Sequence, residues 1–187
     1  MLYLFGWNAI SHLIIEELYE KSILINGVIM DKNFITDEIV NNCKYKVYDF
    51  NQIQFNIGDT VINCLGYKDL SRRKIVGEKL LALNVLKSHI STKADVSSSA
   101  KISDGVILLG NVTIEANAFI GSHSIIWGGA RVCHDAHLGS SVFMAAGSIL
   151  GGYSTMGDFG KIGFNSAIKQ ETIVPNNTII GACCYYK

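Results

Sequence analysis

The stretch that decides the fold runs from Ile114 to Leu138 and reads IEANAFIGSHSIIWGGARVCHDAHL. An aliphatic residue recurs in it at every sixth position, and a small residue follows four places after each aliphatic one. A helix repeats every 3.6 residues and an ordinary strand every two, so neither produces a period of six. The pattern predicts short strands separated by regular turns.

The same period continues without interruption over residues 90–180. Every position in the series is aliphatic or Met: Ile90, Val96, Ile102, Leu108, Ile114, Ile120, Ile126, Val132, Leu138, Met144, Leu150, Met156, Ile162, Ile168, Val174 and Ile180. Three hexads close one coil, so residues 18 apart stack, with the aliphatic side chain on the axis and the small residue at the bend. This is the signature of a left-handed parallel β-helix of about five coils.

The two halves of the chain differ in composition. Residues 1–88 hold 20 of the 32 charged residues but only 5 of the 18 glycines. Their apolar runs predict strands over 2–5, 23–30, 45–48 and 60–65, with helices over 11–20 and 69–86. Strand–helix–strand order favours a small parallel sheet. We therefore expect a Rossmann-like α/β domain over residues 1–88 and the β-helix over residues 89–187.

Charge and composition exclude several functions. The formal net charge is zero and basic runs are absent, which argues against a nucleic-acid partner. No apolar run approaches the roughly 18 residues that a membrane span needs. The first residues lack the basic segment of a signal peptide. The five cysteines show no CxxC spacing, which favours reduced thiols in a cytoplasmic protein.

His134 is the candidate general base. Its stacking neighbours, 18 residues away, are Ala116 and Gly152, which leave room for a ligand to approach the imidazole. Asp135 follows directly and can orient the ring or raise its basicity. A histidine beside a carboxylate on a glycine-lined face is suited to proton abstraction.

The chain resembles bacterial sugar-nucleotide N-acetyltransferases of the sialic-acid O-acetyltransferase type, which act on UDP- or dTDP-linked 4-amino-4,6-dideoxy sugars. The resemblance covers nearly the whole chain and is carried by the hexapeptide repeat and by the segment Val132–Gly139, VCHDAHLG. It implies that His134 is the catalytic base and that Asp135 raises its basicity. Cys133 stands where these enzymes have a preceding acid.

The resemblance also implies binding residues. Acetyl-CoA contacts fall on Phe143, Gly152, Gly163, Phe164, Gly181 and Ala182, although many of these enzymes have a polar residue at the position of Phe143. The nucleotide-sugar contacts fall on Gly6, Trp7, Asn8, Asp31 and Gly66. The first loop contains no GxGxxG, so NAD is not expected, but a pyrophosphate can lie at the N-terminus of the helix that follows.

The implied reaction is direct transfer of an acetyl group from acetyl-CoA to a sugar amine. The amine attacks the thioester while His134 takes its proton, a backbone N–H near Gly152 stabilises the oxyanion, and no metal or covalent intermediate is needed. The resemblance further implies a bacterial homotrimer with its active site between subunits, working in surface glycan biosynthesis.

Three other functions stay open from the sequence. A sugar O-acetyltransferase would use the same fold, co-substrate and base with a hydroxyl nucleophile. A zinc-dependent carbonic anhydrase on the same β-helix needs three histidines that converge between subunits, for which His123, His134 and His137 are the candidates. A non-catalytic binding protein is the third, because fold does not fix function.

Overall fold

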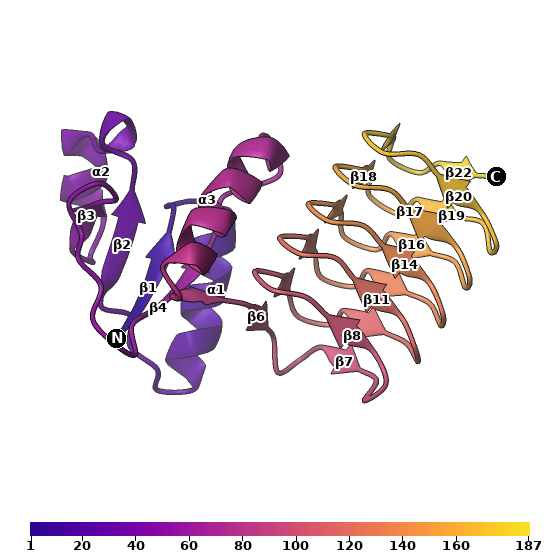
Figure 1. Ribbon diagram of the computed structural model, residues 1–187, viewed down its shortest axis with the longest axis horizontal. Helices are drawn as coiled ribbons and strands as arrows, with labels where there is room; N and C mark the ends of the chain where they lie inside the picture. Colours follow the sequence, from indigo (N-terminus) through magenta and orange to yellow (C-terminus); the bar gives the residue numbers. More distant parts are fainter. The chain divides into compact units, whose positions relative to one another are not determined.

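The structure is a computed structural model that describes residues 1–187. The chain divides into two compact units, Met1–Lys87 and Ser88–Lys187, which Figure 1 shows in indigo to magenta and in magenta to yellow. The change in composition along the sequence places the boundary one residue later. Each unit has its own core, and each is described by itself below.

The first unit is a parallel sheet of five strands in the order β3-β2-β1-β4-β5, with helices on its connections. The strands are β1 (Leu2–Phe5), β2 (Gly27–Met30), β3 (Val47–Asp49), β4 (Thr60–Asn63) and β5 (Leu86–Lys87). The helices are α1 (Ala9–Glu20), η1 (Lys32–Phe34), α2 (Asp37–Asn42) and α3 (Leu70–Ala82). All four residues of β1 and of β2 are buried, which is typical of parallel strands covered on both faces. No helix in the structure has both the length and the apolar character that crossing a membrane requires.

This sheet matches the Rossmann expectation only in part. A doubly wound dinucleotide-binding sheet has six strands in the order 3-2-1-4-5-6. Here the sheet ends at β5, which is two residues long, and the first loop has no GxGxxG. The unit is therefore a small parallel α/β sheet and not a complete Rossmann domain.

Local capping explains where the helices differ from the sequence prediction. Helix α1 begins at Ala9 and not at residue 11, because the Asn8 side chain accepts a hydrogen bond from the Ile10 N–H and caps the helix. Helix α3 ends at Ala82 because Asn84 takes a left-handed conformation with φ of 57°. The chain then turns into β5, which pairs with β4.

The second unit consists of three stacked parallel sheets, which we call faces 1, 2 and 3. Face 1 consists of β7 (Asp95–Val96), β10 (Thr113–Ile114), β13 (Arg131–Val132), β16 (Ile149–Leu150), β19 (Ala167–Ile168) and β22 (Tyr185–Tyr186). Face 2 consists of β8 (Lys101–Ile102), β11 (Phe119–Ile120), β14 (His137–Leu138), β17 (Thr155–Met156) and β20 (Ile173–Val174). Face 3 consists of β6 (His89–Ile90), β9 (Ile107–Leu108), β12 (Ile125–Ile126), β15 (Phe143–Met144), β18 (Lys161–Ile162) and β21 (Ile179–Ile180). Pairs such as Arg131↔Ile149 and Val132↔Leu150 have the expected register of 18 residues.

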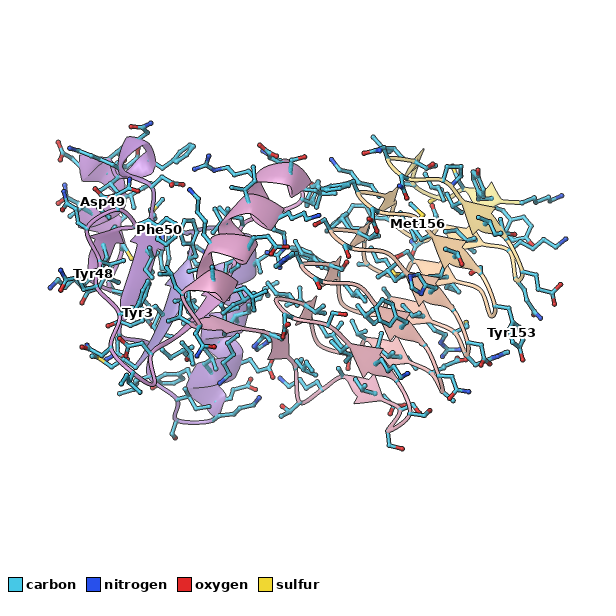
Figure 2. The ribbon with its side chains drawn as sticks, viewed as in Figure 1. Tyr3, Tyr48, Asp49, Phe50, Tyr153 and Met156 are labelled. Atoms are coloured by element: carbon cyan, nitrogen blue, oxygen red, sulfur yellow. The ribbon has the colours of Figure 1, made fainter.

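The aliphatic series forms the core of this unit. From Leu108 to Ile180, every residue of the series is buried, and together with small residues such as Ala118 and Ala130 they make one continuous cluster. Figure 2 shows Met156 among the coils and Tyr153 at their outside; their exposed fractions are 0% and 56%. The first position, Ile90, is 44% exposed, so the buried core begins after it. Stacked parallel sheets of this kind fit the left-handed parallel β-helix.

The corners between the strands are tightly constrained. Many hold a residue in the left-handed region: Asn111, Asn117, His123, Asp135, Ser141, Tyr153, Phe159, Asn165, Glu171, Asn177 and Cys183. Other corner positions admit only glycine, since a Cβ on Gly121 would lie 2.5 Å from the carbonyl carbon of Gly139. Consecutive coils are therefore in direct backbone contact at these corners.

Candidate active site

The candidate base lies on one edge of the β-helix. We call this the histidine edge: the corners after β10, β13 and β16, which contain residues 115–118, 133–136 and 151–154 and join face 1 to face 2. His134 and Asp135 occupy its middle corner. The side chain of His134 is 46% exposed, so a substrate can reach the imidazole.

His134 and Asp135 form a hydrogen-bonded pair, with His134 Nδ1 3.1 Å from Asp135 Oδ2. The second carboxylate oxygen, Oδ1, accepts a hydrogen bond of 3.1 Å from Asn117 Nδ2. The hydrogen bond with His134, and after it the one from Asn117, hold the pKa of Asp135 below its usual range. When Nδ1 donates its proton to this carboxylate, Nε2 is left as the acceptor nitrogen. In that tautomer, Nε2 is the nitrogen of the pair that is free to accept a proton.

Gly152 provides the space in front of that nitrogen. A Cβ at this position would lie 2.9 Å from His134 Nε2 and 3.0 Å from Cε1. The ring of Tyr153 contacts the imidazole edge-on, with centroids 5.1 Å apart. Gly152 thus keeps His134 Nε2 open while Tyr153 packs against the ring.

Glu115 fixes the backbone of the same corner. Its Oε2 accepts a hydrogen bond of 2.9 Å from the His134 backbone N–H, and its Oε1 lies 3.8 Å from Arg131 Nε. Burial, followed by the negative charge of Glu115, raises the pKa of the Cys133 thiol. Because a thiolate and not a thiol is the nucleophile, Cys133 is poorly placed to act as one.

Most of the predicted acetyl-CoA residues lie on a different edge. We call this the glycine edge: residues 163–166 and 181–184, at corners joining face 3 to face 1. A Cβ on Gly163 would lie 2.5 Å from the carbonyl carbon of Gly181 and from the nitrogen of Ala182, so these corners are in direct contact. Phe164 is 55% exposed, and its carbonyl accepts a hydrogen bond from the Cys183 N–H.

The predicted residues therefore form separate groups within one chain. Gly152 stacks on His134 at the histidine edge, whereas the group around Gly163 lies at the glycine edge. Phe143 is in neither group: it is buried in β15, with its ring 6.2 Å from that of Trp127. A single copy of the β-helix thus does not bring the predicted acetyl-CoA residues together around His134.

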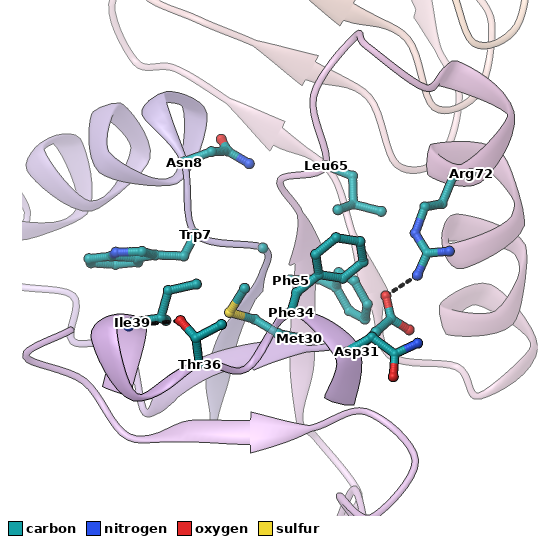
Figure 3. A pocket seen from close by; sticks show the side chains of 12 residues that line it. Phe5, Trp7, Asn8, Met30, Asp31, Phe34, Thr36, Ile39, Leu65 and Arg72 are labelled. Atoms are coloured by element: carbon teal, nitrogen blue, oxygen red, sulfur yellow. Dashed lines mark hydrogen bonds and ion pairs between the residues drawn. The ribbon is translucent and has the colours of Figure 1, made fainter. Parts of the chain in front are cut away.

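The α/β unit contains a pocket of about 420 Å³ at the carboxyl ends of its strands (Figure 3). Four of the five residues predicted to contact a nucleotide sugar line it, namely Gly6, Trp7, Asn8 and Asp31. Gly66 is not a lining residue, but the preceding Leu65 is. The carboxyl ends of parallel strands are the usual place for a ligand in sheets of this class.

Arg72 is the basic residue of this pocket. Its guanidinium pairs with the carboxylate of Asp31, as the dashed line in Figure 3 marks, and lies 5.6 Å from the centroid of the Phe34 ring. The pocket thus presents a carboxylate and a guanidinium side by side, next to apolar side chains. Such a pair can accept from an N–H group and donate to a neighbouring carbonyl or phosphate oxygen.

The surrounding loops are held by hydrogen bonds. Asn8 caps α1 and donates to the carbonyl of Cys64. The buried Arg73 donates to the carbonyls of Asn63 and Leu65, the latter at 2.9 Å, while Asn63 Nδ2 donates back to the Arg73 carbonyl. Burial lowers the pKa of Arg73 to about 10. The Cys64 loop between β4 and α3 is consequently fixed where it borders the pocket.

Sequence reasoning missed four residues that these two sites use: Glu115, Asn117, Tyr153 and Arg72. Asn117 and Tyr153 are 18 residues on either side of Asp135, so the repeat itself carried the signal for them. Glu115 is likewise 18 residues before Cys133. The pairing of Arg72 with Asp31 had no such signal, because 41 residues without periodicity separate them.

The three histidines considered as zinc ligands lie at different places in the chain. His137 stacks on Phe119 with the rings nearly parallel and 4.5 Å apart, while His134 faces Tyr153. Within residues 1–187, no group of three His, Cys, Asp or Glu side chains could hold a metal ion.

No protein-family model matches the sequence, and no curated protein matches it either. Among solved structures, the chain is similar to the acetyltransferase domain of PglB from Neisseria gonorrhoeae, with a TM-score of 0.85 and 19% identity over 100% of this chain and 90% of that one. It is similar to a histidine-to-alanine variant of GDP-perosamine N-acetyltransferase from Caulobacter crescentus, in complex with CoA and GDP-perosamine. The TM-score there is 0.81, at 20% identity over 100% and 88% of the two chains.

A third similar structure is WeeI from Acinetobacter baumannii, with a TM-score of 0.72 and 17% identity over 99% of this chain and 95% of that one. At these identities the likeness is one of fold. The likeness covers both the α/β sheet and the β-helix, because each of the three alignments spans nearly the whole chain.

Proposed function

We propose that the protein transfers the acetyl group of acetyl-CoA to the amine of a nucleotide-linked amino sugar, of the 4-amino-4,6-dideoxy type. The observation that carries the proposal is the His134–Asp135 pair, whose free nitrogen is left open by Gly152. The similar Caulobacter protein is named as a GDP-perosamine N-acetyltransferase and holds CoA and GDP-perosamine, which correspond to the thiol product and the kind of sugar substrate proposed here.

His134 acts as the general base. The neutral amine nitrogen attacks the thioester carbonyl carbon, and His134 Nε2 takes a proton from that nitrogen as the C–N bond forms. The C–S bond then breaks, and the CoA sulfur leaves and is protonated. Asp135 stabilises the imidazolium that forms on His134, since its carboxylate is ionised and bonded to Nδ1. The backbone N–H of Gly152 stabilises the oxyanion.

The α/β unit binds the nucleotide part of the sugar substrate. Asp31 and Arg72 contact polar groups of the nucleotide, and the apolar lining with Trp7 and Phe34 covers its flat surfaces. This is the role we assign to the α/β part of the chain, with residues 1–88 holding the nucleotide and residues 89–187 carrying out the transfer.

The active site forms between copies of the β-helix in a homotrimer. Support comes from the separation of the predicted residues within one chain, where Gly152 lies at the histidine edge and the Gly163 group at the glycine edge. A neighbouring copy that offers its glycine edge to the histidine edge would complete the acetyl-CoA site. The acetylated sugar would serve surface glycan synthesis in the bacterial cytoplasm.

Release of free thiol from acetyl-CoA against a panel of nucleotide-linked amino sugars tests the proposal. We expect release with one amino sugar in the wild type, and a loss of roughly 10²–10⁴-fold in His134→Ala, the usual contribution of a general base. His137→Ala is the matched control, because His137 is also exposed on the β-helix but stacks on Phe119. If the enzyme acetylated only sugars that carry a hydroxyl in place of the amine, the nucleophile would be a hydroxyl group and not an amine. Full activity in His134→Ala would refute the assignment of the base.

A further inference from the structure

Asn117 lies directly beside Asp135 in the neighbouring coil. Its Nδ2 donates to Asp135 Oδ1 at 3.1 Å, while Asp135 Oδ2 is 3.1 Å from His134 Nδ1. The two carboxylate oxygens therefore have different partners. One binds the amide and the other binds the imidazole, so rotation of the carboxylate about its own axis would break both contacts.

The backbone holds this amide in place. The N–H of Asn117 donates to Ser99 Oγ at 3.0 Å, and the N–H of Asp135 donates to the carbonyl of Ala116 at 2.9 Å. Asn117 and Asp135 both have left-handed backbones, with φ of 60° and 56°. Asn and Asp adopt this conformation more readily than most residues. The two residues thus occupy equivalent positions in successive corners, which brings their side chains within hydrogen-bonding distance.

We infer that Asn117 is a positioning residue that fixes the Asp135 carboxylate, so that His134 carries its proton on Nδ1 and keeps Nε2 free as the base. The inference rests on the proposed function, because it takes His134 as the base of the transfer. Asn117 touches neither of the reacting groups and acts only through Asp135 on His134.

A purely conformational role for Asn117 has to be separated from this one. Asn111 occupies another left-handed corner of the β-helix, also with φ of 60°, and its N–H donates to the Lys93 carbonyl. Both asparagines therefore suit their backbone. Only Asn117 has its amide on the carboxylate of the pair, so Asn111 is the matched control for the corner itself.

Other titratable groups surround the pair and must be considered for any pH effect. They are Glu115, which accepts from the His134 backbone, Arg131 beside Glu115, the half-buried Cys133, and Tyr153 against the imidazole. Of these only Tyr153 contributes to the low pKa of Asp135, and it contributes less than His134 and Asn117 do. Loss of the Asn117 amide should therefore raise the pKa of Asp135.

The test compares Asn117→Gly with Asn111→Gly, since glycine tolerates both left-handed corners. Nitrogen-15 NMR of the histidine rings reports which nitrogen carries the proton, with the His134 signals assigned by their loss in His134→Ala. We expect Nδ1–H in the wild type and in Asn111→Gly, and a mixture of the two tautomers in Asn117→Gly. The kcat should fall roughly tenfold with KM unchanged, which is the lower end of the loss seen when the hydrogen-bonded partners of metal-ligating histidines are removed.

A second variant guards against loss of folding. Asn117→Asp also suits the left-handed corner but has no N–H to donate, so it should shift the tautomer in the same direction. If both Asn117 variants fold and keep the wild-type tautomer, the inference is wrong. Because the NMR measurement needs no substrate, a tautomer shift in an enzyme that acetylates no amino sugar would uphold the positioning of His134 and refute the proposed function.

Discussion

The β-helix and the α/β sheet bury their strands in opposite ways. Most two-residue strands of the β-helix bury one side chain on the axis and direct the other outward, as Leu150 and Ile149 do, with exposed fractions of 0% and 39%, whereas β9, β12 and β15 of face 3 bury both. Strands β1 and β2 of the sheet bury every residue. Reactive side chains in the β-helix can therefore sit at the corner positions that are not restricted to glycine, whereas in the sheet they are confined to the loops after the strands. Accordingly, His134 lies at a corner of the β-helix, and the pocket with Asp31 lies at the carboxyl ends of the strands of the sheet.

The largest effect should come from emptying the axis of the β-helix. Leu150→Ala removes buried methyl groups from a continuous core and should lower the free energy of unfolding by about 2–5 kcal/mol. Ile149→Ala, in the same strand, should cost less than about 1 kcal/mol, because that side chain points outward. Chemical denaturation measures both. A cost for Ile149→Ala equal to that for Leu150→Ala would show that face 1 is covered in the assembled protein.

Next in size is a change that closes the histidine edge without disturbing the core. Gly152→Ala places a methyl group 2.9 Å from His134 Nε2, so thiol release should fall by at least about 100-fold, or roughly 2.7 kcal/mol in the barrier. Gly110→Ala is the control, because its Cβ would meet nothing closer than 3.7 Å. The rate should fall in Gly152→Ala alone while the melting temperatures of both variants stay near that of the wild type. An active Gly152→Ala would place the reaction elsewhere.

The corresponding change in the α/β unit, at Arg72 of helix α3, should affect only the binding of the nucleotide sugar. Arg72→Ala leaves Asp31 without its partner and removes the basic group of the pocket. Because hydrogen bonds to charged groups contribute about 1.5–3 kcal/mol, the KM for the nucleotide sugar should rise roughly tenfold or more. The KM for acetyl-CoA should not change. Lys32→Ala removes an exposed positive charge from the adjacent turn and should leave both values as they are; equal effects of the two variants would point to general electrostatics.

The smallest effect that we expect is on the pH dependence of stability, and it comes from cysteine thiols. Burial raises the pKa of the Cys64 thiol from 9.0 to about 12 in the folded protein. Between these values the folded state binds more protons than the unfolded one, so the free energy of unfolding should fall as pH rises above 9.0, by at most about 1.4 kcal/mol per pH unit. Arg73, with its pKa lowered to about 10, acts in the opposite direction above that pH.

Variants of two cysteines isolate this contribution. Cys64→Ala should flatten the alkaline slope of the melting temperature, and Cys183→Ala, which changes an exposed thiol of the β-helix, should leave the slope unchanged. A thiol reagent should label Cys183 in the folded protein but not Cys64. An unchanged slope in Cys64→Ala would mean that other groups govern the alkaline stability.

The side-chain contacts that could be predicted from the sequence are those that follow from the regular repeat of the β-helix. The register of 18 residues placed Gly152 against His134 from the sequence, and the structure has them within contact. Counting 18 residues back from Asp135 in the same way leads to Asn117. The two edges of the β-helix could also have been separated in this way, because the corner of Gly163 and that of His134 follow strands of different faces.

In the α/β unit, spacing along the chain does not predict which side chains meet. Asp31 and Arg72 meet because the loop after β2 and the first turn of α3 converge at the same end of the sheet, which depends on strand order and not on spacing. Helix α3 was predicted too long because nothing in its apolar pattern signals the left-handed turn at Asn84. Helix α2, with six residues, is too short to show a periodic pattern.

The register of the β-helix also limits how such a chain can change in length. Removing six residues would rotate every later strand onto the next face and carry the glycine edge away from its position relative to His134. Removing 18 would shorten the stack by one coil and leave each remaining side chain on its own face. Whole coils are therefore the only units by which the repeat can change in length with its faces kept in line. A coil gained or lost outside residues 115–184 leaves the spacing of the two edges unchanged, so the number of coils can vary over evolution while the geometry around His134 is inherited intact.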